Sequence, residues 1–258
     1  QKSGSFVNTT VAEIDPTLVG AIRSSGGTYS VNVAGADQIY TQEVRGLQIL
    51  NPLEPEDRKS LVQAISEATE LCTALPSFKL YDQGEDSVAK IIAEGLELKL
   101  TSSEYPPAVI YAAENDSRAA KRLKEACLKE MHAGFGNKVW FSETVIGKMC
   151  SVVTDSNKIT NDGLVPIVDS FPKAFLVEQF DKIYIEEAKP AGFTRGLSQF
   201  IEKRDLDPFA IAKFLGQNAT HATLGYLAEE AGLVNMNELE DYPEIVERGL
   251  IAYIEEAG

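Results

Sequence analysis

Residues 107–125, PAVIYAAENDSRAAKRLKE, decide the fold class of this chain. The stretch begins with a continuous apolar segment that ends on an acid and an amide, Glu114 and Asn115, and a charged amphipathic helix is predicted to follow over 116–131. A strand without polar alternation is buried on both faces, as in a parallel sheet that is covered by helices on both sides. The stretch therefore predicts an α/β fold.

The same alternation of strands and helices precedes this stretch. Asp15 and Pro16 mark the start of a helix that stops at Gly26-Gly27, because Asp is a favoured N-cap and proline fits the first helical position. Strands are predicted over 6–14, 28–33, 38–44 and 70–76, the middle two as a hairpin, and further helices over 55–68 and 86–98. Ligands of parallel sheets bind beyond the carboxyl ends of the strands, where Glu13, Thr73 and Asn115 fall.

The pattern changes after residue 139. Residues 139–187 are predicted to form strands without a helix between them, GLVPIVD at 163–169 included. After Gly192 the chain is predicted to be wholly helical, over 193–203, 207–232 and 243–257. We therefore expect two domains: an α/β domain with a strand-rich extension over 1–190, and an α-helical domain over 191–258.

Composition argues against several functional classes. The net charge of −15 disfavours binding to nucleic acid through phosphate neutralisation. No apolar run reaches the roughly 18 residues that a membrane span needs. Three widely spaced cysteines are typical of reduced thiols in a cytoplasmic protein. The two histidines, His132 and His221, lie 89 positions apart, so neither a zinc cluster nor an H-E-x-x-H helix can be built locally.

The stretch KFLGQNATHATLGYL, residues 213–227, holds the candidate catalytic group. On an α-helix, Asn218 lies roughly 140° and His221 roughly 80° around the axis from Lys213, with a rise of roughly 12 Å from Lys213 to His221. A long lysine arm or a bend at Gly216 is then needed for convergence. A lysine in an apolar pocket can act as a base, and an asparagine amide can stabilise a developing alkoxide, so the trio suits oxidation of an alcohol without a metal. The alternative is a solvated lysine beside a structural asparagine and histidine.

This stretch fits the K-x4-N-x2-H signature of the polyol-specific long-chain dehydrogenases, in the mannitol dehydrogenase superfamily, and the likeness covers nearly the whole chain. It is closest to the mannitol-1-phosphate 5-dehydrogenase subfamily. The other segments that resemble this subfamily are GTYSVNV (27–33), ELCTALP (70–76), AVIYAAENDSRAAKRLKE (108–125) and TNDGLVPIVDSFPKAFLVE (160–178). The resemblance implies a Rossmann-type NAD-binding domain, a helical catalytic domain, and hydride transfer between NAD and a sugar alcohol or its ketose.

The resemblance also implies a role for each matching residue. Lys213 is the general acid/base, Asn218 and Asn115 hold the reacting oxygen, and His221 positions the substrate. Glu13 binds the adenosine ribose and thereby favours NAD over NADP. Two further groups complete the implied set: Thr73 and Ala74 along the cofactor, and Lys148 near the substrate. The expected partner is a polyol or polyol phosphate, and the expected assembly a monomer or weak dimer.

Two departures leave alternatives open. No G-x-G-x-x-G occurs, so the first strand and its phosphate-binding turn are expected before residue 1, and the chain reads as an internal portion of a longer enzyme. Relatives also carry an aspartate-arginine pair where this chain has Gly147-Lys148. The alternatives are a non-catalytic binding or regulatory protein on a degenerate scaffold, and a dehydrogenase of unphosphorylated mannitol or a uronate-derived polyol.

Overall fold

The computed structural model of the chain describes residues 8–179 and 182–257. The chain divides into two compact units between Glu202 and Lys203, which are called unit 1 and unit 2 below. The sequence placed this boundary near residue 190. The difference arises because β10 (Ile183–Glu186) and β11 (Phe200–Lys203) are strands of the unit 1 sheet, so the helix predicted over 193–203 is wrong.

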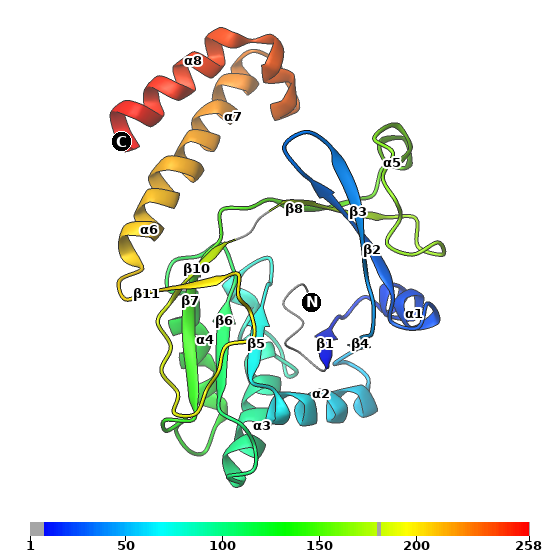
Figure 1. The fold of residues 1–258 in the computed structure, drawn as a ribbon, viewed down its shortest axis with the longest axis vertical. Helices are drawn as coiled ribbons and strands as arrows, with labels where there is room; N and C mark the ends of the chain where they lie inside the picture. Colours follow the sequence, from blue (N-terminus) through cyan, green and yellow to red (C-terminus); the bar gives the residue numbers. More distant parts are fainter. Residues whose placement is uncertain (1–7, 180–181, 258) are drawn as a thin grey trace. The chain divides into compact units, whose positions relative to one another are not determined.

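The central sheet of unit 1 contains the predicted parallel strands. Its order is β11-β10-β7-β6-β5 (Figure 1). Strands β5 (Glu70–Thr73), β6 (Ala108–Ala112) and β7 (Val139–Val145) run parallel, and β10 pairs antiparallel with β7. Every residue of β6 is buried. The apolar segment of the deciding stretch is therefore a central strand, as predicted.

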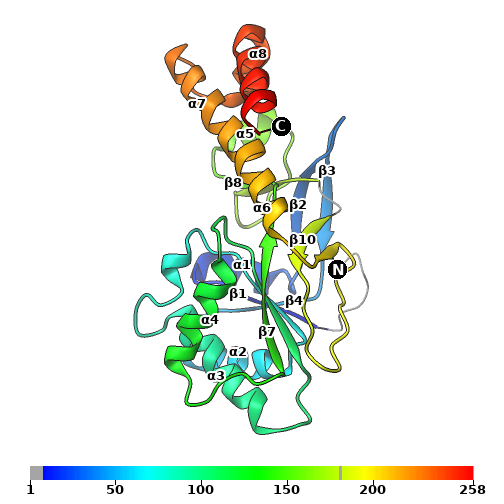
Figure 2. The ribbon, with the colours of Figure 1, turned by 90° about the vertical axis from the view of Figure 1, so that its left-hand side faces the viewer.

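The two faces of β6 meet different layers. Ile110 and Ala112 belong to the core cluster that the helical layer covers. Val109 and Tyr111 point to the other face, where they pack with Ile185, Phe193 and Phe200. The covering helices, seen beside the sheet in Figure 2, are α2 (Pro55–Glu67), α3 (Val88–Thr101) and α4 (Ala119–Glu130). Within the described residues, α2, α3 and α4 thus cover one face of this sheet, and apolar side chains of the segment 187–200 pack on the other.

A pair of parallel strands forms the second sheet. Strand β1 (Thr9–Ala12) pairs with β4 (Leu47–Leu50), and α1 (Pro16–Ser24) lies between them in sequence. Strand β4 was not predicted, because four residues that follow a hairpin show too little periodicity. Residues 6 and 7 of the strand predicted over 6–14 lie outside the described residues.

The third sheet has the order β3-β2-β9-β8. The predicted hairpin is confirmed, since β2 (Tyr29–Ala34) pairs antiparallel with β3 (Ile39–Val44). The sheet adds β9 (Ala174–Glu178) and β8 (Cys150–Val153). The prediction of no helix over 139–187 is wrong, because α5 (Ser156–Asn161) forms there behind the Asp155 N-cap. The strand predicted over 163–169 is also wrong: Ile167 and Val168 pack in the core that α1 covers, and the segment contains an isolated bridge between Val168 and Phe171 instead of a strand.

Unit 2 is helical, as predicted for residues 207–257. Its long first helix has three parts: α6 (Asp207–Ala212), the π-helical segment η2 (Lys213–Ala219) and α7 (Thr220–Glu230). The 3-10 helix η3 (Met236–Asp241), α8 (Pro243–Ala252) and the π-helical segment η4 (Tyr253–Ala257) follow. Helices α7 and α8 pack closely, since a Cβ placed on Gly249 would lie 2.4 Å from Cδ2 of Leu224. No described helix has both the length and the apolarity to cross a membrane.

Candidate active site

The carboxyl ends of β5 and β6 bring two of the predicted residues to one edge of the central sheet. Thr73 ends β5, and Asn115 follows β6 after two residues. The two strand ends are joined by a hydrogen bond of 2.9 Å from the N–H of Ala113 to the carbonyl oxygen of Thr73. Ligands of parallel sheets bind at such an edge. Thr73 and Asn115 therefore lie where a ligand of unit 1 is expected.

A buried carboxylate for which the sequence predicted no role organises this edge. Glu114 is only 6% exposed and lies between Ala113 and Asn115. It accepts hydrogen bonds from Thr73 Oγ1 at 3.0 Å and from the N–H of Leu75 at 3.0 Å. The Tyr81 hydroxyl, next to the 3-10 helix η1 (Phe78–Leu80), also donates to it. Burial, followed by the bond to Glu114, raises the pKa of Tyr81.

The other end of the loop that carries Asn115 is held by a second carboxylate. Glu143 on β7 accepts hydrogen bonds from the N–H groups of Ala120 at 3.1 Å and Lys121 at 3.0 Å. These are two of the donors that a helix N-terminus leaves without helical partners, so Glu143 caps α4. Burial raises the pKa of Glu143 although both bonds oppose the shift. Arg118 closes the loop with a φ of 65°, an unfavourable value for a side chain of this size.

Glu13 lies at the carboxyl end of β1, as predicted. Its N–H donates to the carbonyl oxygen of Leu50 at 3.0 Å, which continues the ladder to β4. Its Oε1 accepts the N–H of Asp15 at 2.8 Å. Asp15 caps α1 by accepting the N–H of Thr17 at 2.9 Å, as its position in the sequence indicated. The half-buried carboxylate is thus fixed between a strand end and a helix start.

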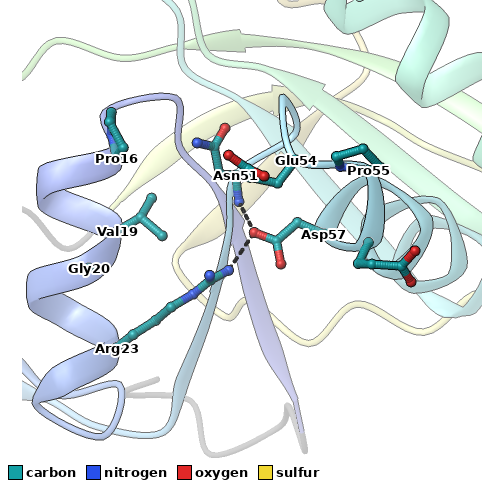
Figure 3. Close-up of a pocket in the computed structure, with 9 residues that line it drawn as sticks. Pro16, Val19, Gly20, Arg23, Asn51, Glu54, Pro55 and Asp57 are labelled. Carbon is teal, nitrogen blue, oxygen red and sulfur yellow. Dashed lines mark hydrogen bonds and ion pairs between the residues drawn. The ribbon is translucent and has the colours of Figure 1, made fainter.

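A surface hollow beside this strand end contains none of the predicted site residues (Figure 3). Arg23 of α1 forms an ion pair with Asp57 of α2 at 2.5 Å, and the N–H of Asn51 donates to the same carboxylate at 2.7 Å. The Asn51 hydrogen bond and then Arg23 lower the pKa of Asp57. These contacts join α1, β4 and α2, so we interpret the hollow as a structural junction. Its lining residues are Pro16, Val19, Gly20, Arg23, Asn51, Glu54, Pro55, Glu56 and Asp57.

Unit 2 presents Lys213, Asn218 and His221 on one side of its first helix. Lys213 begins the π-helical segment, Asn218 lies within it, and His221 is the second residue of α7. Hydrogen bonds in a π-helix join residues five apart, so Asn218 lies one turn above Lys213 instead of roughly 140° away. His221 lies three positions beyond Asn218, the spacing of α-helical neighbours. The change of helix type thus reduces the angle about the axis that an α-helix would place between Lys213 and Asn218.

The surroundings of Lys213 favour its neutral form. Its side chain is half-buried, and burial lowers its pKa from the ordinary value of a lysine. Gly216 of the same segment is buried, and a Cβ there would lie 3.0 Å from Cε2 of Tyr253 in η4. Asn218 is half-buried and His221 is exposed. The segment thus combines a half-buried amine and a half-buried amide with an exposed imidazole.

Besides Lys148, Lys189 and Arg195 are basic residues of unit 1 with the charge that phosphate recognition needs, and the environments of the three differ. Arg195 donates to the Tyr111 hydroxyl and forms an ion pair with Glu202. Lys189 forms an ion pair with Glu187 at 2.9 Å. Lys148 is exposed in the connection from β7 to β8 and forms no ion pair within residues 8–179 and 182–257. The described residues also include no group of three or more His, Cys, Asp or Glu side chains that could hold a metal ion.

Curated relatives match most of the chain. A mannitol-1-phosphate 5-dehydrogenase of Lactiplantibacillus plantarum is 22% identical over 243 residues, which are 93% of this chain and 57% of the relative. One from Bacillus subtilis is 27% identical over 239 residues, which are 91% of this chain and 57% of the relative. No protein-family model matches. The resemblance to the mannitol dehydrogenases is confirmed, and the chain spans about half of the length of these relatives.

Solved structures show the same fold. The mannitol 2-dehydrogenase of Pseudomonas fluorescens, in a ternary complex with NAD and D-mannitol, matches 93% of this chain and 55% of its own with a TM-score of 0.70 at 14% identity. A D-sorbitol dehydrogenase in substrate-free form matches 84% of this chain and 52% of its own with a TM-score of 0.65 at 12% identity. The predicted α/β class, with a helical second unit, is therefore confirmed.

Proposed function

We propose that this chain carries residues of an NAD-dependent polyol dehydrogenase that interconverts mannitol 1-phosphate and fructose 6-phosphate. The main support is the grouping of Lys213, Asn218 and His221 on one side of a helix that changes from π to α between them. Short π-helical segments are rare and are frequent at functional sites. The likeness to mannitol-1-phosphate 5-dehydrogenases supports the same class of reaction.

The side chains supply the proton chemistry of the proposed reaction. Oxidation of an alcohol requires a base for the hydroxyl proton, and Lys213 is that base because burial favours its neutral amine. Asn218 donates an amide N–H group to the oxygen as negative charge develops on it, and the resemblance gives Asn115 of unit 1 the same chemistry. His221 orients the substrate hydroxyl groups from the exposed side of the helix. This set needs no metal ion.

The residues at the strand ends of unit 1 fit parts of NAD, which when bound accepts the hydride. The Glu13 carboxylate at the end of β1 suits hydrogen bonds from ribose hydroxyls and disfavours a 2′-phosphate. The backbone of Thr73 and Ala74 ends β5 beside the loop of Asn115. The Thr73 hydroxyl itself is engaged by Glu114, so we assign the contact with the cofactor to the backbone. The pyrophosphate is assigned to no described residue.

We assign recognition of the substrate phosphate to Lys148. Arg195 and Lys189 already pair with acidic side chains, and a cation beside a carboxylate attracts phosphate less strongly. Lys148 is exposed and forms no ion pair within the described residues, and by the resemblance it occupies the position where relatives carry an arginine. An unphosphorylated polyol is the alternative substrate. It is favoured if Lys148→Met leaves the KM for mannitol 1-phosphate unchanged.

The test is an assay of NADH formation by the purified protein with mannitol 1-phosphate, mannitol and a uronate-derived polyol. Lys213→Met is expected to lower kcat by about 10²-fold to 10⁴-fold, the range of general acid–base catalysis. Arg248→Met, an exposed change on α8 of the same unit, is the matched control and is expected to keep full turnover. Full turnover by Lys213→Met would refute the assigned role.

A non-catalytic scaffold is the second candidate function, favoured by the Gly147-Lys148 departure from the aspartate-arginine pair of relatives. Titration calorimetry with NAD separates the two. A wild-type protein that binds no NAD and turns over none of the three polyols supports the scaffold. Binding with turnover supports the enzyme.

A further inference from the structure

The three donors to Glu114 come from separate segments of unit 1. Thr73 is the last residue of β5, Leu75 belongs to the turn after it, and Tyr81 follows η1. Glu114 itself belongs to the loop after β6, and its carbonyl oxygen accepts the N–H of Asp116 at 2.8 Å. One side chain therefore holds the loop of one strand end against the turn of the next.

The charge of Glu114 is expensive to bury, and its donors are all neutral. They are a threonine hydroxyl, a backbone N–H and a phenol, and within the described part of the chain it forms no ion pair with a lysine, arginine or histidine. A carboxylate offers two acceptor oxygens, and hydrogen bonds to an ionised acceptor are roughly twice as strong as neutral ones. A charged acceptor therefore holds the three segments more tightly than a neutral one.

The neighbours of this cluster are the residues that the proposed function uses. Asn115 directly follows Glu114, and the backbone of Thr73 and Ala74 directly precedes Leu75. Glu114 is nearly fully buried whereas Asn115 and Ala74 are exposed at the same edge. The carboxylate therefore lies beneath the groups that we expect to meet the cofactor and the reacting oxygen.

We propose that Glu114 is a positioning residue for hydride transfer. Its carboxylate joins the turn after β5 to the loop of Asn115. The backbone of Thr73 and Ala74, which receives the nicotinamide, and the Asn115 amide, which meets the substrate oxygen, are thereby held at a fixed distance and orientation. The inference rests on the proposed function. Misplacement of a reacting group by about 1 Å can cost roughly 10²-fold in rate, so loosening this joint affects turnover more than it affects affinity for the polyol.

The test replaces Glu114 while its size is kept. Glu114→Gln keeps one acceptor oxygen and replaces the other with an NH₂ group. An NH₂ group is itself a donor, so it cannot accept the hydrogen bonds of the Thr73 and Tyr81 hydroxyls. We expect kcat to fall by roughly 10²-fold, the NAD dissociation constant to rise by roughly tenfold, and the KM for the polyol to change by less than about threefold. Glu114→Asp keeps the charge and is expected to recover part of kcat.

The matched control is a second buried hydrogen-bonding hub outside this edge. Asn32 on β2 is fully buried, donates to the carbonyl oxygens of Val165 and Phe175 at 2.9 Å, and accepts the N–H of Val165 at 2.9 Å. Asn32→Ala is expected to lower the free energy of unfolding without lowering kcat or NAD affinity. A loss of kcat in Glu114→Gln no greater than in Asn32→Ala overturns the positioning role.

Hydrogen exchange gives a readout that does not depend on activity. The N–H of Leu75 and the amides of 113–116 are expected to exchange at least about tenfold faster in Glu114→Gln, and unchanged exchange overturns the inference. A wild-type protein with neither NAD binding nor turnover overturns the proposed function and this role with it. If Glu114→Gln does not fold, Thr73→Val and Tyr81→Phe each remove one donor. Each is then expected to lower kcat, and full activity in both overturns the proposal.

Discussion

The fully buried ammonium of Lys99 is expected to stabilise unit 1 in a pH-dependent way. Lys99 lies near the end of α3 with none of its surface exposed. Its Nζ donates to the carbonyl oxygens of Ser66 and Ala68 at 2.7 Å and of Pro106 at 2.9 Å. The first two are acceptors at the end of α2 that lack helical donors. Lys99→Met keeps an apolar chain of similar length and removes all three donations.

The expected loss at neutral pH is the difference between two opposing effects. Three hydrogen bonds from a charged donor contribute roughly 1.5 kcal/mol each at the low end of their range, or about 4 to 5 kcal/mol. Burial, followed by repulsion from Lys138, lowers the pKa of Lys99 from 10.5 to about 8. That shift corresponds to a cost of roughly 3 kcal/mol for keeping the charged form. The net free energy of unfolding lost in Lys99→Met is therefore about 1 to 2 kcal/mol near pH 7.

The pH dependence gives the sharper test. Between about pH 8 and about pH 10.5 the unfolded chain holds the Lys99 proton while the folded chain releases it, so this residue makes the wild type more stable as the pH rises. The variant lacks this gain. The gap in stability between the two proteins is therefore expected to widen by up to roughly 3 kcal/mol toward pH 10. Other groups that titrate in this range are common to both proteins and largely cancel in the difference.

The measurement is urea unfolding at several pH values, followed by tryptophan fluorescence. Trp140, the only tryptophan of the sequence, lies on β7 and reports on unit 1. Lys90→Met, on the same helix, is the matched control because Lys90 is only half-buried and donates to one carbonyl, that of Glu85. It is expected to change stability by no more than about 0.5 kcal/mol at any pH. A gap for Lys99→Met that stays constant with pH would falsify this account of the buried charge.

Two further predictions concern helix packing and the proposed base. Gly95→Ala places a Cβ 2.4 Å from Cγ2 of Ile65 and 3.0 Å from the carbonyl oxygen of Val62, so the free energy of unfolding is expected to fall by roughly 1 to 3 kcal/mol. Urea unfolding measures it, and a variant as stable as the wild type contradicts the close contact of α2 and α3. Polyol oxidation is expected to slow as the pH falls through the lowered pKa of Lys213, because a protonated amine cannot accept the hydroxyl proton. A pH–rate profile of kcat/KM measures this decrease at low pH. The same decrease in Lys213→Met would show that a group other than Lys213 titrates.

The elements that sequence reasoning identified have strong local signals. The apolar strand at 108–112 and the helix that Asp15 and Pro16 begin formed as predicted, because uninterrupted burial and capping chemistry act within a few residues. The segment 193–203 differs: Phe193 and Phe200 have apolar character but no local cue that they cover Tyr111, a contact between residues far apart in sequence. A strand of four residues such as β4 is likewise fixed by its partner, β1.

The candidate site divides in the same way. Asn115, Thr73 and Glu13 could be located from the rule that parallel strands end at one edge, and the structure brings Thr73 and the loop of Asn115 together there. No role was predicted for Glu114, because the sequence does not show whether an acid at a strand end points to solvent or into the protein. The π-helical turn at Lys213 also has no signature in the spacing alone, and the closeness of Gly216 to Tyr253 is a contact between residues far apart in sequence.

The π-helical winding of that turn sets the rotation of everything after it in unit 2. If the same residues were wound as an uninterrupted α-helix, the downstream residues would rotate by roughly 100° about the axis. Asn218 and His221 would then leave the side of Lys213. Leu224 would also leave the space at Gly249 that its side chain fills. One change of helix type therefore sets the orientation of the polar trio and of the apolar seam together.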